Sequence, residues 1–194
     1  MSQPTSSNDR VDLNRIAAAV REILIATGED PDREGLKATP MRVARMYQEL
    51  FNGLGEDPAR HLATTFTEEY DEMVVLRDIP FNSVCEHHLM PFEGKAHVAY
   101  LPKGKVVGIS KLARVVDAFA HRPQVQERLT SQIADLLMSS LEAKGVAVLI
   151  SATHTCMTCR GVRKPGSIMV TSAVRGLCKS DPRTRGEVMS LLQG

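Results

Sequence analysis

The chain has 194 residues, of which 43% are hydrophobic and 24% charged, with a formal net charge of +1. This balance is typical of a globular protein and excludes a collagen-like or wholly disordered chain. No apolar run approaches the ~20 residues that cross a bilayer, and the polar start MSQPTSSNDR lacks the hydrophobic stretch of a secretory signal. We therefore expect a cytoplasmic protein that binds neither a membrane nor nucleic acid.

Charge is unevenly distributed along the chain. Acidic residues outnumber basic ones by 14 to 8 over residues 1–72, and basic residues outnumber acidic ones by 16 to 9 over residues 73–194. The second part is therefore suited to an anionic ligand, although an uneven solvated surface explains the same count.

The sequence pattern of the N-terminal third predicts short helices. Residues 1–9 are polar and predict a disordered tail. Apolar residues then recur at helical spacing from Leu13 to Leu24, before a stop at Gly28. Asp30-Pro31, Thr39-Pro40 and Asp57-Pro58 pair a capping residue with a proline, which predicts further helical starts. We expect a helical region over residues 10–66.

After residue 66 the sequence pattern changes and predicts both strands and helices. Strands are predicted over 73–76, 96–101, 106–109, 146–152 and 168–174, and helices over 110–120, 125–143 and 181–192. The turn Pro102-Lys103-Gly104-Lys105 predicts that the second and third strands form a hairpin. This order predicts an α+β domain over residues 67–194 with a largely antiparallel sheet.

Two clusters carry metal-ligand residue types. Cys85-Glu86-His87-His88 is the first, and His154-Thr155-Cys156 followed by Cys159 is the second. A closed structural site would use Cys85, His88, Cys156 and Cys159, whereas an open site would use three ligands and leave a position for water, with histidines free for proton transfer. Spacing alone does not separate the two. A redox pair of Cys156 and Cys159 lacks the usual βαβ setting.

Anion-binding and base-recognition candidates lie between and after these clusters. Ser110-Lys111 opens a predicted helix that carries Arg114, and Arg160 follows the second cluster; basic groups at a helix start suit a phosphate. No glycine-rich nucleotide loop of standard type is present. Gln126-Glu127 opens the next helix, where a carboxylate either caps the helix dipole or accepts the N–H donors of a purine or pterin edge.

Several segments in a fixed order resemble the GTP cyclohydrolase I family. They are CEHH, GISKLAR, RPQVQERLT, HTCMTCRGVRKPGS and TSAVRG, and the likeness covers about residues 10–194. The resemblance implies a tunnelling fold (T-fold), with a four-stranded antiparallel sheet backed by two helices and an N-terminal helical extension. It also implies a homodecamer with active sites at subunit interfaces.

The resemblance implies a reaction and roles by motif. A zinc-dependent hydrolase of the cyclic amidine class would convert GTP and water to 7,8-dihydroneopterin triphosphate and formate, the first step of folate and pterin biosynthesis. Cys85, His88 and Cys156 would hold Zn²⁺, and His154 and His87 would transfer protons. Substrate-binding residues would be Ser110, Lys111, Arg114, Gln126, Glu127 and Arg160.

Cys159 departs from the family's pattern, which does not require a cysteine there. It therefore leaves the four-ligand site as an alternative, in which a closed metal stabilises a binding or assembly module without catalysis. A sister T-fold enzyme acting on another pterin or purine derivative is a further alternative. The two histidines beside the ligands favour an enzyme, since a structural site needs no proton-transfer groups.

Overall fold

The structure is a computed structural model that describes residues 11–193. The chain forms two compact units, one ending at Glu56 and the other beginning at Asp57. The predicted tail over residues 1–9 lies outside the described residues, and the predicted domain division after residue 66 stays a prediction. Among the described residues, no helix is both long and apolar enough to cross a membrane.

The first unit is a pair of packed helices, α1 (Leu13–Ala26) and α2 (Thr39–Leu50), followed by a short 3-10 helix, η2 (Asn52–Gly55). The Asp12 carboxylate accepts the Arg15 N–H and caps α1. The prediction of a helix start at Asp30 is wrong. The Asp30 carboxylate accepts the N–H of Asp32, only two residues on, and so closes a turn and does not cap a helix.

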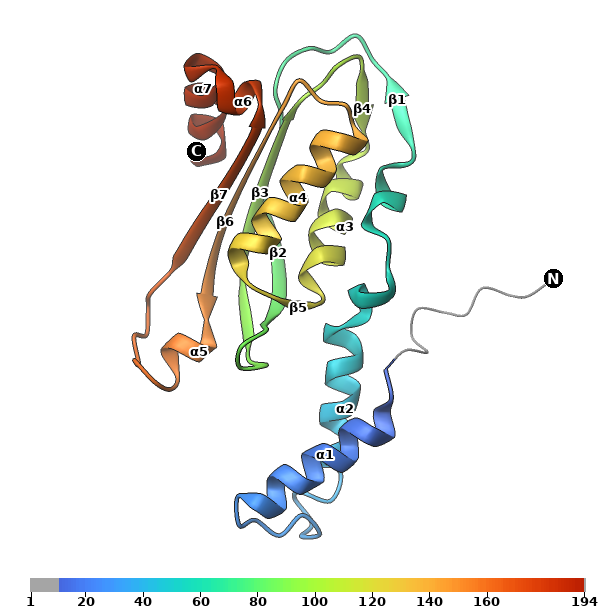
Figure 1. The fold of residues 1–194 in the computed structure, drawn as a ribbon, viewed down its shortest axis with the longest axis vertical. Helices are drawn as coiled ribbons and strands as arrows, with labels where there is room; N and C mark the ends of the chain where they lie inside the picture. Colours follow the sequence, from blue (N-terminus) through green and yellow to red (C-terminus); the bar gives the residue numbers. More distant parts are fainter. Residues whose placement is uncertain (1–10, 194) are drawn as a thin grey trace, which may run out of the picture. The chain divides into compact units, whose positions relative to one another are not determined.

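The second unit is built on a five-stranded sheet in the order β5-β2-β3-β6-β7 (Figure 1). Its strands are β2 (Val74–Cys85), β3 (Pro91–Leu101), β5 (Pro123–Gln124), β6 (Gly145–His154) and β7 (Met169–Gly176). The four long strands are antiparallel, and β5 adds two residues in parallel along β2. The α+β prediction with four antiparallel strands is confirmed, apart from the extra strand β5.

The two faces of the sheet are covered by different helices. Helices α3 (Ile109–Ala120) and α4 (Gln126–Ser140) cover one face and bury Val98 and Tyr100 with the main core. Because side chains alternate along a strand, Ala99 faces the other way, where it packs with Val188 and Leu192 of α7 (Pro182–Gln193). The short helix α6 (Leu177–Ser180) links β7 to α7.

The predicted hairpin between 96–101 and 106–109 is wrong. Strand β4 (Lys105–Val107) pairs with β1 (Thr65–Thr67), which follows the 3-10 helix η3 (Pro58–Leu62). The reason is that both edges of β3 are already hydrogen-bonded, one to β2 and the other to β6. The N–H of Val107 donates instead to the hydroxyl of Tyr100 at 3.1 Å.

Two glycines test this packing as a matched pair. A methyl group at Gly94 in β3 would meet the Ser151 carbonyl oxygen and lie 2.6 Å from the Cα of Ala152, whereas at Gly186 in α7 it would meet nothing within 4 Å. We expect Gly94→Ala to destabilise the protein by more than about 3 kcal/mol because backbone must move. Gly186→Ala should raise stability by about 0.5–1 kcal/mol, since alanine favours helix.

Urea unfolding followed by circular dichroism measures both changes. A Gly94→Ala protein as stable as the wild type would contradict the close β3–β6 approach.

Candidate active site

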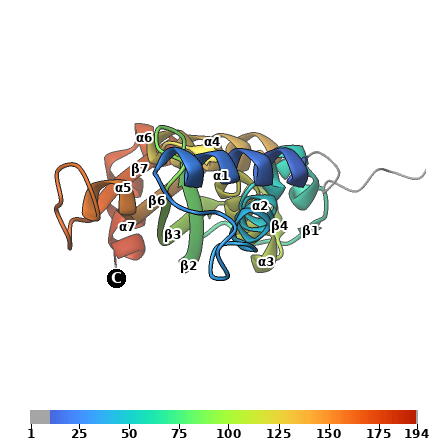
Figure 2. The same cartoon turned by 90° about the horizontal axis from the view of Figure 1, so that it is seen from below.

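The sheet brings the two ligand clusters to one end. Cys85 is the last residue of β2, and His88 lies in the turn that leads to β3. On the other side of β3, His154 ends β6, and Cys156 follows in the short helix α5 (Thr155–Thr158). Because Phe92 is paired with His154 in the β3–β6 register, these strand ends lie beside each other. Helix α5 and the loop after it extend beyond the sheet there (Figures 1 and 2).

A tight turn fixes the positions of the residues in the first cluster. The Cys85 carbonyl accepts the N–H groups of His88 and Leu89, and the Cys85 N–H donates to the Met90 carbonyl at 2.8 Å. Leu89 takes a left-handed conformation, with φ of 52°, which closes the turn. As a result the Nδ1 atom of His88 lies 3.7 Å from the Sγ atom of Cys85.

Ligand atoms of Cys85, His88 and Cys156 all lie within 4.8 Å of one another. Burial raises the pKa of the Cys156 thiol, and the neighbouring Cys85 sulfur raises it further, while Arg160 opposes the shift. Two adjacent sulfurs in such a place ionise together only if a cation shares them. Thiolates with an imidazole are the donor set of a soft or borderline metal ion. These three residues could therefore hold a metal.

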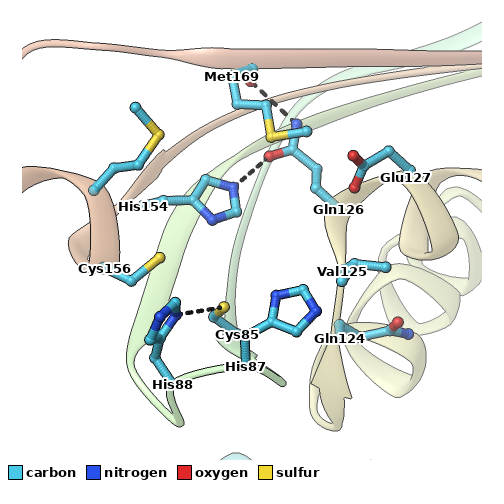
Figure 3. Close-up of a pocket in the computed structure, with 11 residues that line it drawn as sticks. Cys85, His87, His88, Gln124, Val125, Gln126, Glu127, His154, Cys156 and Met169 are labelled. Carbon is cyan, nitrogen blue, oxygen red and sulfur yellow. Dashed lines mark hydrogen bonds between the residues drawn. The ribbon is translucent and has the colours of Figure 1, made fainter. Parts of the chain in front are cut away.

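His154 is held on two sides. Its ring stacks on that of Phe92, with centroids 4.4 Å apart and planes 6° apart, and its Nε2 atom lies 2.8 Å from Oε1 of Gln126. The Gln126 amide donates through Nε2 to the carbonyls of Ile150 and Met169, so Oε1 must accept and His154 Nε2 must donate. The other ring nitrogen faces the space between Cys156 and Cys85 (Figure 3).

The environment of His154 shifts its basicity in two directions. Burial lowers the pKa of His154, and the nearby Glu127 carboxylate raises it in part. Glu127 lies in the first turn of α4, and the residue that precedes this helix, Val125, provides no side-chain cap. The first N–H groups of any helix lack intrahelical acceptors. Without a cap, those of α4 are open to an acceptor on a ligand.

These groups line one cavity of about 220 Å³. It lies between the sheet end, the candidate metal-binding turn (residues 85–90) and the start of α4 (Figure 3). Its lining residues are Cys85, His87, His88, Gln124, Val125, Gln126, Glu127, His154, Cys156, Met157 and Met169. Seven of the predicted site residues are thus brought together here, which are Cys85, His87, His88, Gln126, Glu127, His154 and Cys156.

Comparison with known proteins decides the family. The sequence model of "GTP cyclohydrolase I" matches residues 16–193. The chain belongs to the GTP cyclohydrolase I family. It is 63% identical over 185 residues to "GTP cyclohydrolase 1" of Rhodopirellula baltica, covering 95% of this chain and 81% of that one. It is 64% identical over 183 residues to the protein of that name from Carboxydothermus hydrogenoformans, covering 94% and 95%.

The predicted membership of the GTP cyclohydrolase I family is confirmed, and with it the prediction of an enzyme of this class. Among solved structures, the apo form of the archaeosine synthase QueF-Like is similar, with a TM-score of 0.45 and 20% identity over 54% of this chain and 93% of that one.

Four predicted substrate residues do not line the cavity. The described residues that line it do not include Ser110, Lys111, Arg114 or Arg160. Helix α3 ends beside β2, where the Ser83 hydroxyl donates to the Ala120 carbonyl. At 1.5 Å per residue, the Cα of Lys111 lies roughly 13 Å back along that helix. Arg160 donates to the Cys156 carbonyl at 3.1 Å.

The cavity is also lined by four residues that no motif in the sequence predicted, Gln124, Val125, Met157 and Met169. No sequence signal identifies Met169, because it reaches the cavity only through the pairing of β7 with β6. Gln124 and Val125 directly precede Gln126, so their position beside a predicted binding residue was the available signal.

Cys159 lies outside the ligand group that the described residues form, and its side chain is exposed. We therefore expect Cys159→Ser to keep the metal content of the wild type. Cys156→Ser should lose most of its metal, because one of three ligands is removed. Atomic absorption after dialysis measures both, and loss of metal in Cys159→Ser would restore the four-ligand alternative.

Proposed function

We propose that this chain hydrolyses GTP to 7,8-dihydroneopterin triphosphate and formate, using Zn²⁺ held by Cys85, His88 and Cys156. The observation that carries the proposal is the convergence of these three ligands with His154 and Glu127 in one cavity. In a cytoplasmic setting this would be the first step of folate and pterin biosynthesis, as the sequence resemblance implies.

The ligand spacing fits zinc. Zn–S and Zn–N bonds of about 2.3 and 2.0 Å at a tetrahedral angle place sulfur and nitrogen about 3.5 Å apart. The distance between Cys85 Sγ and His88 Nδ1 is 3.7 Å. With three protein ligands, the fourth coordination position of the zinc would stay open to a water molecule. Zinc would lower the pKa of that water to about 7 and so supply a nucleophile.

The start of α4 suits the edge of guanine. That edge presents N–H donors at N1 and the 2-amino group beside the acceptor O6, and a carboxylate can accept both donors. Glu127 would supply the carboxylate, and the uncapped N–H groups of the first helical turn would donate to O6. Gln126 would contribute its backbone N–H, because its side chain holds His154 in place.

Two histidines would move protons. Because Gln126 fixes one ring nitrogen of His154 as a donor, the cavity-facing nitrogen of the neutral ring is an acceptor. It would take a proton from the attacking water and pass that proton to the imidazole nitrogen of guanine. The side chain of His87 is 64% exposed at the cavity, where solvent can exchange its proton, and would act in the opening of the ring.

The triphosphate requires a second copy of the chain. A volume of about 220 Å³ is below the roughly 300–1,000 Å³ of typical ligand pockets. In the same chain, Ser110 and Lys111 lie at the start of α3, whose other end is beside β2, and none of Ser110, Lys111 and Arg114 lines the cavity. We propose that Ser110, Lys111 and Arg114 of one subunit complete the cavity of its neighbour, in a homodecamer, and that Arg160 adds a phosphate contact.

The test of the reaction is formate release from GTP by the purified full-length protein. Formate should appear with zinc, cease after chelation and return on zinc addition, because the nucleophile depends on the metal. His154→Ala should lower the rate by about 10²–10⁴-fold at unchanged zinc content. A zinc-loaded wild type that releases no formate would favour the closed or non-catalytic alternative.

The phosphate assignment predicts a selective loss in Lys111→Ala. Its KM for GTP should rise by at least about tenfold, because one charge-assisted contact is lost, while its KM for guanosine should not change. An equal effect on both substrates contradicts the assignment.

Shared sites also predict complementation between subunits. At GTP concentrations well below KM, mixing Lys111→Ala with His154→Ala after dissociation and reassembly should give about a quarter of the wild-type activity, since that fraction of sites draws both residues intact. Mixtures with no more than the small residual activity of the Lys111→Ala protein would indicate that each site uses both residues from one subunit.

A further inference from the structure

A bidentate ion pair joins the metal-binding turn to helix α4. The Arg128 Nη1 and Nη2 atoms donate to the two carboxylate oxygens of Glu86, at 2.5 and 3.0 Å. Glu86 lies between the ligand Cys85 and His87, and Arg128 follows Glu127 in the first turn of α4. Neither side chain has a role in the proposed function described above.

The pair reinforces a backbone joint at the same place. The Glu86 N–H donates to the Gln124 carbonyl at 3.0 Å, and Cys85 is paired with Gln124 where β5 runs along β2. The side-chain pair adds a second attachment beyond the end of the strand. Together they fix both the position and the tilt of the turn relative to α4.

Stability alone does not explain this arrangement. The two side chains are 46% and 30% exposed, and exposed ion pairs contribute little to the free energy of folding. The two parallel hydrogen bonds nevertheless restrict geometry strongly, since the planar guanidinium and the carboxylate match in only one orientation. The main effect of the ion pair is therefore to fix the position of the turn relative to α4.

The neighbours of the Glu86–Arg128 ion pair indicate which groups it positions. On one side are Cys85 and His88, which would hold the metal, and on the other is Glu127, which would hold the guanine edge. The carboxylate also faces His87, whose Nε2 atom lies 3.9 Å from Glu86 Oε1. Attack on a bound base requires the nucleophile and the base at a fixed separation, and an error of about 1 Å costs on the order of 10² in rate.

We propose that Glu86 and Arg128 are positioning residues that clamp the metal-binding turn to the first turn of α4, and so set the distance between the metal and the bound guanine. The proposal rests on the proposed function for its catalytic consequence. Its structural part, the clamp itself, is independent of that function.

The kinetic test uses Glu86→Gln, Arg128→Met and the milder Arg128→Lys. Breaking the clamp should lower kcat by about 10–100-fold, while KM for GTP changes by less than about threefold and zinc content is unchanged, because every proposed ligand remains. Arg128→Lys should lie between Arg128→Met and the wild type, since it keeps the charge without the fork. Glu86→Gln combined with Arg128→Met should cost no more than the worse single change.

A matched control lies on the same helix. Asp135 of α4 accepts a hydrogen bond from Arg175 of β7 at 2.6 Å, in a partly exposed ion pair that is not part of the cavity. Asp135→Asn should leave kcat and KM unchanged. If the Glu86 and Arg128 variants match Asp135→Asn, or lose activity only through loss of zinc, the positioning role is overturned.

Hydrogen exchange tests the clamp without catalysis. In metal-free, nucleotide-free protein, peptides covering residues 83–92 and 124–130 should exchange at least about threefold faster in Glu86→Gln than in the wild type or Asp135→Asn. Unchanged exchange overturns the clamp. A wild type that releases no formate, together with faster exchange in Glu86→Gln, would instead overturn the proposed function and leave the clamp in place.

Discussion

The site depends on strand β3 being paired along both edges. With β2 on one side and β6 on the other, the turn after β2 and the end of β6 lie at the same end of the sheet. That pairing brings Cys85 and His88 to Cys156 and stacks Phe92 on His154. Gly94 permits the close approach of β3 and β6, since any side chain there would strike the facing backbone.

The cavity is assembled from three parts, two of which share Gln126. The turn over residues 85–90 is anchored to β5 and to Arg128, His154 is anchored by Phe92 and Gln126, and Glu127 is anchored by the helix that begins at Gln126. Gln126 is the common element, because its buried amide bonds the ends of β6 and β7 as well as His154. Polar groups in such a network are satisfied by one another and leave few alternative arrangements.

One chain supplies only part of what the proposed reaction needs. The cavity contains groups for a metal, for proton transfer and for a base edge, while the basic start of α3 lies at the other end of its helix. A helix is stiff, so no side-chain movement closes a separation along its axis. The proposed shared site between subunits would unite the two sets, and assembly would then be a condition of activity.

The sequence by itself determined the family, the α+β class, most element positions and the two short motifs whose cysteines and histidines meet at the cavity. These follow from local patterns: periodicity, capping residues and short motifs whose chemistry is carried by neighbouring positions. Only the tertiary structure decided that β4 pairs with β1, that Asp30 closes a turn, that Cys159 lies outside the ligand group, and that the Gln126 side chain holds His154. Most of these outcomes depend on partners distant in sequence: which strand edges remain unpaired, which carbonyls meet a buried amide, and which sulfur faces the others. Local spacing does not contain that information, because it arises only when the sheet is formed.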